Sequence, residues 1–256
     1  KGEIHISPKD LRSTINPISQ DILDIINSKE IQDIIKYFED HIVFPDEPGN
    51  PTGIYKYCVR YAKEHGKVYT KVGKYKDEFG VTQERQVFDR YEQDNPNEYR
   101  LIIIDTINLI DTERGMTLKQ SMDKLSEYCA KHLRNRYNYS PVIIQQQAFD
   151  QEGNEAFKIG RVRPSVAGLG DSKYTSRDSN VVLGLFSPFS FALKEYEDYD
   201  ISKFKDNIRF LEMIVNRDGE MGGLCPLFFD GAVCQFNELP RPDDNDGIKK
   251  VYEYLK

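Results

Sequence analysis

The chain has 256 residues, of which 30% are charged, and it carries a formal net charge of −7. Such a length allows one large domain or two small ones. The sequence contains no apolar run near the ~18 residues of a membrane span and no signal-peptide pattern. These two observations predict a soluble, cytoplasmic protein with no membrane role. The acidic balance excludes a surface that is basic throughout, but it is compatible with a local basic loop or a ring whose channel alone is basic.

The first 98 residues are predicted to be a helical lead-in with a hairpin insertion, within the same domain as the rest. Their expected elements, in chain order, are helices within residues 1–40, a short strand His41–Phe44, a helix Gly53–Glu64, a Lys- and Tyr-rich hairpin or surface excursion at 67–79 and a polar helix Gln83–Glu92.

The stretch Leu101–Ile110, LIIIDTINLI, is the strongest strand signal in the chain. A continuous β-branched run of this kind is typical of a strand buried on both faces in a parallel sheet. It leads into Asp105, and open α/β sheets bind ligands at the carboxyl ends of their strands. The alternative is a core strand whose terminal Asp only caps the next turn.

A parallel crossover unit is predicted from this strand onward. An amphipathic helix at about Thr117–Arg136 leads to a second apolar run, Pro141–Gln147, and strand, helix, strand is the pattern of one such unit. Further elements expected downstream are strands Asn180–Phe186, Arg209–Asn216, Leu224–Phe229 and Val233–Leu239, with Asp230-Gly231 as a hairpin turn, and a helix Gly247–Leu255. The predicted architecture is an α/β domain with an antiparallel hairpin on its carboxyl side.

Three consecutive amides, Gln145, Gln146 and Gln147, end the second strand of this unit. They cannot all be unpaired core residues, since a buried unpaired amide costs about 1–3 kcal/mol. One interpretation is a hydrogen bond across the sheet to Asp105. The other is a Gln that contacts a terminal phosphate or its attacking water.

Two further candidates lie toward the carboxyl side. Arg217, in the turn after a predicted strand, is either an ordinary solvated Arg or one that reaches the phosphates of a neighbouring subunit, a role that suits its planar fork of five donors. The loop Lys158–Lys173 is rich in Gly and Ser, and it is either an ordinary solvated loop or a contact for a phosphodiester chain. Its candidate DNA-binding residues are Lys158, Arg161, Arg163 and Lys173.

The cysteines and histidines form no catalytic or metal-binding pattern. The four cysteines lack metal-type spacing and are expected to be buried thiols in a reducing cytosol, although Cys225 and Cys234 could face each other across a hairpin. The four histidines are scattered and are interpreted as surface residues.

Five segments in order resemble the carboxyl-terminal RecA-like motor domain of DnaB-type replicative helicases. They are LIIIDTINLI with the long helix after it, PVIIQQQ, RPSVAGL, DSNVVLGL and MIVNRDGEMGGLCPLFFDGAVCQF, which together cover about Tyr99–Leu239. The resemblance implies a RecA-like P-loop NTPase core over residues 99–256, with a mainly parallel sheet. Weaker similarity extends upstream through Leu11-Arg12 and Asn50-Pro51-Thr52.

Carried over residue by residue, the resemblance makes Asp105 the Walker B Asp that supports Mg²⁺ and Gln147 the phosphate-sensing Gln. Arg217 would be the arginine finger that completes the ATP site of the next subunit. The loop around Arg163-Pro164 would face single-stranded DNA in the ring, and Asp178 matches a further acidic position of the family.

The sequence also departs from the family. Val215 stands where the family has a basic residue, Leu169–Lys173 lacks the family's Arg, and residues 67–80 resemble an insertion. No G-x-x-x-x-G-K-[ST] motif occurs in the 256 residues, so the backbone cradle and Lys for ATP phosphates are lacking. The strands that precede the matched segment in this fold are missing too, and an unpaired sheet edge is expected.

The resemblance therefore implies the carboxyl part of an ATP-driven, 5′-to-3′ DNA helicase of phage or bacterial type that acts in DNA replication. Its cofactors would be ATP and Mg²⁺, and its partners single-stranded DNA, identical subunits in a hexameric ring and a primase or helicase loader. The alternatives are a non-hydrolysing structural or single-stranded-DNA-binding subunit, and a broader RecA-like ATPase of the recombination or clock type.

Overall fold

The structure is a computed structural model that describes residues 6–45, 49–147, 163–169 and 173–255. It is a mixed α/β protein with parallel and antiparallel strand pairs. The chain divides into two compact units, which are described separately. One unit comprises Asp46–Ile159 and Ser165–Val182, and the other comprises Lys1–Pro45, Gly160–Pro164 and Leu183–Lys256.

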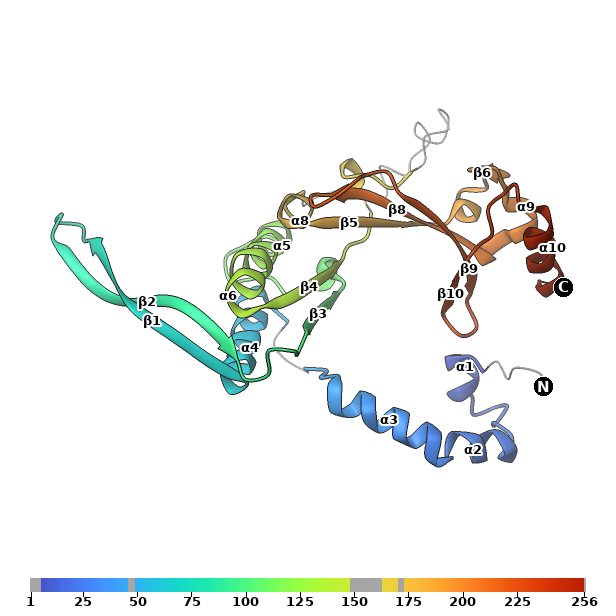
Figure 1. The fold of residues 1–256 in the computed structure, drawn as a ribbon, viewed down its shortest axis with the longest axis horizontal. Coiled ribbons are helices and arrows are strands. Elements are labelled where there is room, and N and C mark those ends of the chain that lie inside the picture. The colour runs from blue at the N-terminus through green and yellow to red at the C-terminus, as the bar shows by residue number, and fades with distance from the viewer. Residues whose placement is uncertain (1–5, 46–48, 148–162, 170–172, 256) are drawn as a thin grey trace. The chain divides into compact units, whose positions relative to one another are not determined.

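The first unit is built around a parallel strand pair and the helices beside it (Figure 1). Its elements are α4 (Pro51–Glu64), β1 (Gly66–Lys76), β2 (Thr82–Gln93), β3 (Arg100–Asp105), the 3-10 helix η1 (Ile107–Leu109), α5 (Leu118–Glu127), the π-helix η2 (Tyr128–Arg134), α6 (Asn135–Tyr137), β4 (Tyr139–Ile144), the 3-10 helix η4 (Ala167–Leu169) and α8 (Tyr174–Asp178). The predicted strand–helix–strand unit is confirmed, because β3 and β4 run parallel with Arg100 opposite Tyr139 and Asp105 opposite Ile144.

The core of this unit lies on one side of the β3–β4 pair, against α4, α5 and η2. Its buried residues are Cys58, Ala62, Tyr91, Ile104, Ile107, Met122, Leu125, Cys129, Leu133, Tyr137 and Tyr139. A buried Arg100 closes one end of this core. Its guanidinium donates to Glu98 Oε1 at 2.6 Å, to the Tyr91 hydroxyl at 2.5 Å and to the backbone carbonyl of His65 at 2.9 Å. These partners offset the cost of burying its charge.

The prediction that the central strand is buried on both faces is wrong. The strand ends at Asp105, and alternate residues point to opposite faces. Ile104 is only 8% exposed, whereas Leu101 and Ile103 are 63% and 65% exposed. Within the described residues β3 and β4 form a two-stranded sheet, and its second face is not covered.

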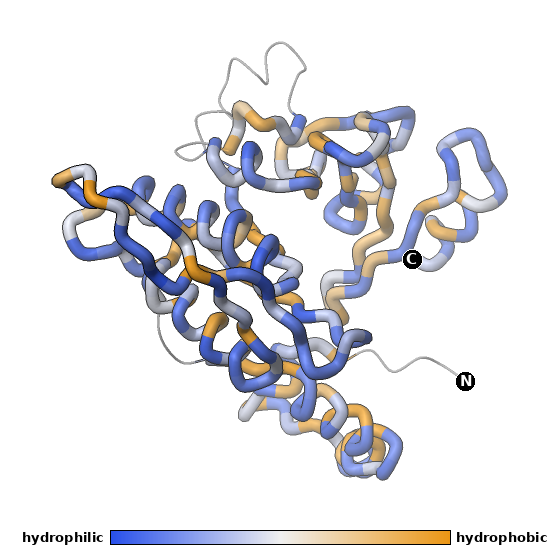
Figure 2. Tube along the Cα trace, turned by 60° about the vertical axis from the view of Figure 1, so that its left-hand side comes forward, coloured by the Kyte–Doolittle hydropathy of each residue, from blue (hydrophilic) through white to orange (hydrophobic). Residues whose placement is uncertain are grey.

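The second region that differs from its prediction is Gln83–Glu92, expected to be a helix. It is part of β2, which pairs antiparallel with β1 from Gly66 opposite Gln93 to Lys76 opposite Thr82. The hairpin predicted at 67–79 is therefore longer than predicted, because those residues form only β1 and part of the turn, and β2 is the second strand. This β1–β2 ribbon extends away from α4 and α6 in Figure 1, and Figure 2 shows that hydrophilic residues predominate along it.

The second unit is organised on a sheet of order β10-β9-β8-β5. Its elements are α1 (Pro8–Leu11), α2 (Gln20–Ile26), α3 (Lys29–His41), β5 (Val181–Phe186, which begins in the first unit), η5 (Pro188–Phe191), β6 (Glu195–Tyr196), β7 (Tyr199–Asp200), α9 (Ile201–Phe204), η6 (Lys205–Asn207), β8 (Ile208–Asn216), β9 (Leu224–Asp230), β10 (Gln235–Glu238) and α10 (Asn245–Tyr254). The predicted hairpin at Asp230-Gly231 is confirmed, because β9 pairs antiparallel with β10.

The core of the second unit is largely aromatic. Its buried residues are Phe186, Tyr199, Ile201, Phe204, Ile208, Phe210, Phe228 and Leu239. By contrast, α1, α2 and α3 contain no buried residue. The strand predicted at His41–Phe44 is wrong, since α3 continues through His41 and the next described residues are irregular.

The predicted single, mainly parallel sheet is not what the described strands form. Parallel pairing joins β3 to β4, whereas β8, β9 and β10 pair antiparallel in a separate sheet. The physical reason is that no described strand bridges β4 and β5. All four cysteines are free thiols; Cys58 and Cys129 are buried as predicted, whereas Cys225 is only partly buried and Cys234 is exposed. No described helix has the length and apolarity needed to cross a membrane.

Candidate functional site

The first candidate residue, Asp105, is the last residue of β3, and its side chain is exposed. It follows Leu101 and Ile103 on the uncovered face of the strand, because residues two apart share a face. The peptide bond from Asp105 to Thr106 is cis. The described geometry therefore presents a carboxylate at the carboxyl end of a parallel pair, the place where such sheets bind ligands.

The chain after Asp105 is fixed by a small polar network. The Thr106 hydroxyl donates to the backbone carbonyl of Ile144 at 3.0 Å, which joins the end of β3 to the end of β4. The Asn108 side-chain oxygen accepts from the backbone N–H of Gln146 at 3.1 Å. These two contacts hold together the segments that follow β3 and β4. Asp105 and the three glutamines therefore lie at the same end of this strand pair, the carboxyl end.

The three glutamines have different surroundings. Gln145 donates to the carbonyl of Leu169 at 2.6 Å, and its side-chain oxygen accepts from the Thr175 hydroxyl at 2.6 Å. Gln146 is exposed. One interpretation of the sequence was a glutamine hydrogen-bonded across the sheet to Asp105. The side chain of Gln145 instead bonds to Leu169 and Thr175.

Gln147 lies directly over the backbone of Gly168. A Cβ added at Gly168 would come within 2.4 Å of the Gln147 amide nitrogen, so any larger residue here would force the Gln147 side chain to move. Gly168 is buried in η4. A change in the position of Gln147 would therefore press on the segment that carries η4, which suits a residue that senses a ligand and reports to a neighbouring loop.

Arg217 lies in the turn between β8 and β9, in the other unit, and is exposed. The turn is closed by its neighbours: the Asn216 side chain donates to the carbonyl of Glu220 at 3.1 Å and accepts from the backbone N–H of Asp218 at 3.2 Å. Gly222 follows with a φ of 83°, where a side chain would be strained. These contacts close the turn that carries Arg217 between β8 and β9.

The predicted DNA-binding loop is described in part. Lys158 and Arg161 lie outside the described residues, and Lys173 is exposed just before α8. Arg163 is engaged within its own unit, because its guanidinium lies 2.8 Å from a Glu197 oxygen and 3.3 Å from a Glu212 oxygen. An incoming phosphate would have to displace these carboxylates.

Asp178, which the sequence resemblance likened to an acidic position of the helicase family, has a structural role at the end of α8. Its carboxylate accepts from the Ser126 hydroxyl at 2.8 Å, and its backbone carbonyl accepts from Arg134 at 3.1 Å. Both contacts fasten α8 to the long helical segment α5–η2. The contact of Asp178 with Ser126, which is 1% exposed, argues for packing rather than chemistry.

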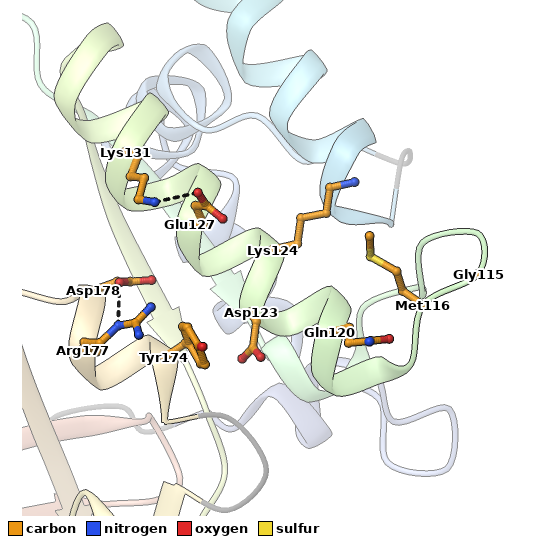
Figure 3. A pocket seen from close by; sticks show the side chains of 10 residues that line it. All are labelled: Gly115, Met116, Gln120, Asp123, Lys124, Glu127, Lys131, Tyr174, Arg177 and Asp178. Carbon is orange, nitrogen blue, oxygen red and sulfur yellow. Dashed lines mark hydrogen bonds and ion pairs between the residues drawn. The ribbon is translucent and has the colours of Figure 1, made fainter. Parts of the chain in front are cut away.

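A groove of about 600 Å³ runs between α5–η2 and α8 (Figure 3). It is lined by Gly115, Met116, Gln120, Asp123, Lys124, Glu127, Lys131, Tyr174, Arg177 and Asp178. Its cations and acids are equal in number and partly paired, with Lys131 2.7 Å from Glu127 and Arg177 3.7 Å from Asp178. The groove includes neither Asp105, Gln147 nor Arg217, so it is not the predicted nucleotide site.

Three site residues were not anticipated from the sequence. Thr106 and Asn108 fasten the ends of β3 and β4, and Gly168 makes room for Gln147. The polar residues directly after the apolar run, in Asp-Thr-Ile-Asn, are the available signal for the first two. Gly168 carries no local signal, because its role depends on a residue about twenty positions earlier.

Comparison with known proteins adds little to this geometry. No protein-family model and no curated protein match the chain. A solved structure described as an ATPase domain aligns with a TM-score of 0.46 and 19% sequence identity, over 57% of this chain. The aligned region covers 46% of that structure, so the chain spans under half of its length.

Proposed function

We propose that the chain is the carboxyl part of a RecA-like motor domain in an ATP-driven DNA helicase of the DnaB type, working as a hexameric ring. The observation that carries this proposal is the exposed carboxylate of Asp105 at the end of a parallel strand pair, with Gln147 seated on Gly168 at the same edge. The order of the matched sequence segments supports it.

Asp105 fits one part of a Mg²⁺·ATP site. Magnesium is commonly bound by one or two carboxylates together with substrate phosphates and water. The described residues contain no cluster of three or more possible metal ligands, so the phosphates would complete the coordination. When bound, Mg²⁺ would neutralise charge on the phosphates. Gln147 would contact the terminal phosphate or the attacking water.

The chain does not fit the triphosphate itself, because its sequence lacks the glycine-rich loop and Lys that cradle phosphates. We therefore propose that this loop is supplied by residues outside the printed sequence, and no hydrolytic step is derived from this chain alone. Arg217 would reach the site of the adjacent subunit from the end of the β8–β9 hairpin. The exposure of Arg217 and the closed turn that carries it support this proposal.

The uncovered face of the β3–β4 pair supports the proposal that further residues complete the motor domain. Leu101, Ile103, Val142 and Ile144 are 63%, 65%, 42% and 42% exposed. Parallel sheets are ordinarily covered on both faces, and apolar side chains gain about 25 cal/mol for each Å² removed from water. In the proposed motor, the missing segment or subunit would cover this face.

For DNA, the proposed contact is the loop containing Lys158, Arg161, Arg163 and Lys173. Arg163 would exchange Glu197 and Glu212 for phosphates, so its gain on binding would be small. A primase or helicase loader would be a further partner of the complete ring.

The second candidate is a non-hydrolysing RecA-like subunit that has a structural or single-stranded-DNA-binding role. The specific observation in its favour is the lack of a phosphate cradle in the sequence. Under this proposal Asp105 would be a surface residue whose removal leaves function intact.

Two measurements separate these candidates. The first is the open reading frame upstream of Lys1, compared with the intact mass of the native protein; a strand–GxxxxGK[ST]–helix unit upstream supports the motor. The second is Mg²⁺-dependent ATP binding by that native protein, measured by calorimetry for the wild type and for Asp105→Asn. Asp21→Asn, on the exposed helix α2, is the matched control. Equal affinity for all three proteins would exclude Asp105 from the site.

A further inference from the structure

The β1–β2 ribbon has two different faces, and the packing of its base identifies them. Val68, Phe88 and Tyr91 point into the core of the first unit. Because residues alternate along a strand, the odd-numbered residues of β1 lie on the opposite face, directed away from this core. This solvent face is not used by the proposed nucleotide site or by the predicted DNA loop.

Cations and tyrosines share this solvent face. From β1 it carries Lys67, Tyr69, Lys71 and Tyr75, and from β2 it carries Arg85 and Arg90. The Arg90 guanidinium lies 4.0 Å and the Lys67 ammonium 5.1 Å from the centre of the Tyr69 ring, and Arg85 lies 5.0 Å from the centre of the Tyr75 ring. Gly73 sits between the two tyrosines, where a Cβ would meet Val87 at 2.9 Å.

The charge of β1 is opposite to that of the chain. Its eleven residues, GKVYTKVGKYK, include four lysines and no acid, in a protein of net charge −7. The acids of β2 neutralise part of this charge, with Asp89 3.0 Å from Lys71 and Glu92 2.9 Å from Arg90. The Arg90–Glu92 pair is solvent-exposed, so a phosphate can compete with it at low energetic cost, whereas in the other pair Lys71 is exposed and Asp89 is half-buried.

An ordinary solvated ribbon would explain the lysines but not the aromatic rings. Tyr75 is 43% exposed on the distal part of the ribbon, where the described residues provide no core to bury it. Rings and guanidinium planes at the surface are the groups on which unpaired bases stack, and cations beside them suit the phosphates of the same strand. Duplex bases are already stacked and would gain only the electrostatic part.

We propose that the solvent face of the β1–β2 ribbon is a binding site for single-stranded nucleic acid, separate from the Lys158–Lys173 loop. Bases stack at the Tyr69 and Tyr75 positions, and the phosphates lie near Lys67, Lys71 and Arg85. The proposal takes its ligand class from the proposed function, but it requires neither ATP nor a ring.

The test is fluorescence anisotropy of the full chain with a labelled single-stranded oligothymidine, without nucleotide, over a series of salt concentrations. One variant, Lys67→Gln with Arg85→Gln, removes two cations from the solvent face. Its matched control, Lys74→Gln with Lys76→Gln, removes two cations from the other face of the same ribbon. A third variant, Tyr75→Leu, removes the ring and keeps the charge. Circular dichroism checks that every variant is folded.

We expect the solvent-face pair to weaken binding about tenfold and to reduce the slope of log affinity against log salt by about 1.4, because each lost phosphate contact on a single strand lowers it by about 0.7. The control pair should change affinity less than about threefold. Tyr75→Leu should weaken binding about fivefold or more with an unchanged salt slope, because stacking is not electrostatic.

Equal losses for the solvent-face pair and the control pair, or full affinity in Tyr75→Leu, would overturn the ribbon site. If, in addition, Arg161→Ala with Arg163→Ala weakens binding, the proposed function survives that failure. Conversely, the native protein could fail to bind ATP while the ribbon variants show the expected effects. That result would exclude the proposed motor function and support the ribbon site.

Discussion

The hydroxyl of Thr175 donates a hydrogen bond to the side-chain oxygen of Gln145 at 2.6 Å, which connects the end of β4 to the first turn of α8. Thr175 is 7% exposed, so water competes poorly for this contact. The same glutamine holds the Leu169 carbonyl, and it therefore orders the segment that carries Gly168 beneath Gln147.

Thr175→Val should destabilise the protein by about 1 kcal/mol, because it keeps the side-chain shape and removes the hydroxyl donor. Urea denaturation measures this change, and hydrogen exchange of residues 174–179 should report faster local opening. Thr175→Ser retains the donor and is the control. If the serine and valine variants lose the same stability, the methyl packing rather than the hydrogen bond matters.

The neighbours Ile103 and Ile104 give a second prediction, because the same residue type occupies opposite faces of β3. Ile104 is 8% exposed and Ile103 65% exposed. In the chain alone, Ile104→Ala should cost about 2–4 kcal/mol, whereas Ile103→Ala should change stability by about 0.5 kcal/mol or less. Thermal or urea unfolding of both variants measures the difference.

The same pair also tests the proposal that a further segment or subunit covers this face in the motor. There, Ile103→Ala should become as costly as other core truncations, since its side chain would be removed from water. Similar losses for both isoleucines in the chain alone would show that the face is already covered.

The parallel unit was accessible from the sequence because its signals are local. Apolar runs at Leu101 and Pro141 with an amphipathic helix between them specify a crossover, and Asp230-Gly231 specifies a hairpin. The exposure of one side of β3 could not be predicted from the sequence, because an apolar run looks the same whether or not a partner covers its second face.

The segment Gln83–Glu92, wrongly predicted as a helix, shows that a bulged strand can have the residue spacing of a helix. The β1–β2 register shifts at Tyr69/Thr70, where Asp89 is the extra residue of a bulge. As a result Phe88 and Tyr91, three positions apart, both reach the core, which is the spacing expected of a helix face. Only the partner strand reveals the bulge. In the same way, the contacts of Gln145 and Gln147 depend on residues 168–175 and not on their own neighbourhood.

Glu113 provides a pH-dependent prediction. Its carboxylate accepts from the backbone N–H of Thr52 at the start of α4 at 2.5 Å and lies 3.4 Å from the Lys124 ammonium. Hydrogen bonds from Thr52, and then the interaction with Lys124, hold the pKa of Glu113 below its ordinary value of 4.5. The position near a helix N-terminus also favours a negative charge.

A lowered pKa means that the folded protein prefers the charged carboxylate, so the stabilisation is present above about pH 4.5 and is lost as pH falls through the folded-state pKa. Glu113→Gln should therefore lower the melting temperature at pH 7, and its difference from the wild type should shrink below pH 4.5. Thermal unfolding from pH 3 to pH 8 measures this, with Glu39→Gln on the exposed helix α3 as control. A difference that is constant across the range would assign the effect to shape and not to charge.

Arg217 gives the prediction that bears most directly on the proposed motor. In the proposed motor, Arg217→Ala should reduce DNA-stimulated ATP hydrolysis by about a thousandfold or more and leave ATP binding nearly unchanged, since an arginine finger acts on transition-state charge. Arg241→Ala, another exposed arginine of the same unit, is the control. Mixing Arg217→Ala with Asp105→Asn subunits tests the direction of action. If Arg217 serves the neighbouring subunit, mixed rings contain some sites in which both native residues meet, and part of the activity returns. Full activity of Arg217→Ala alone would exclude the finger role, and no recovery on mixing would exclude action between subunits.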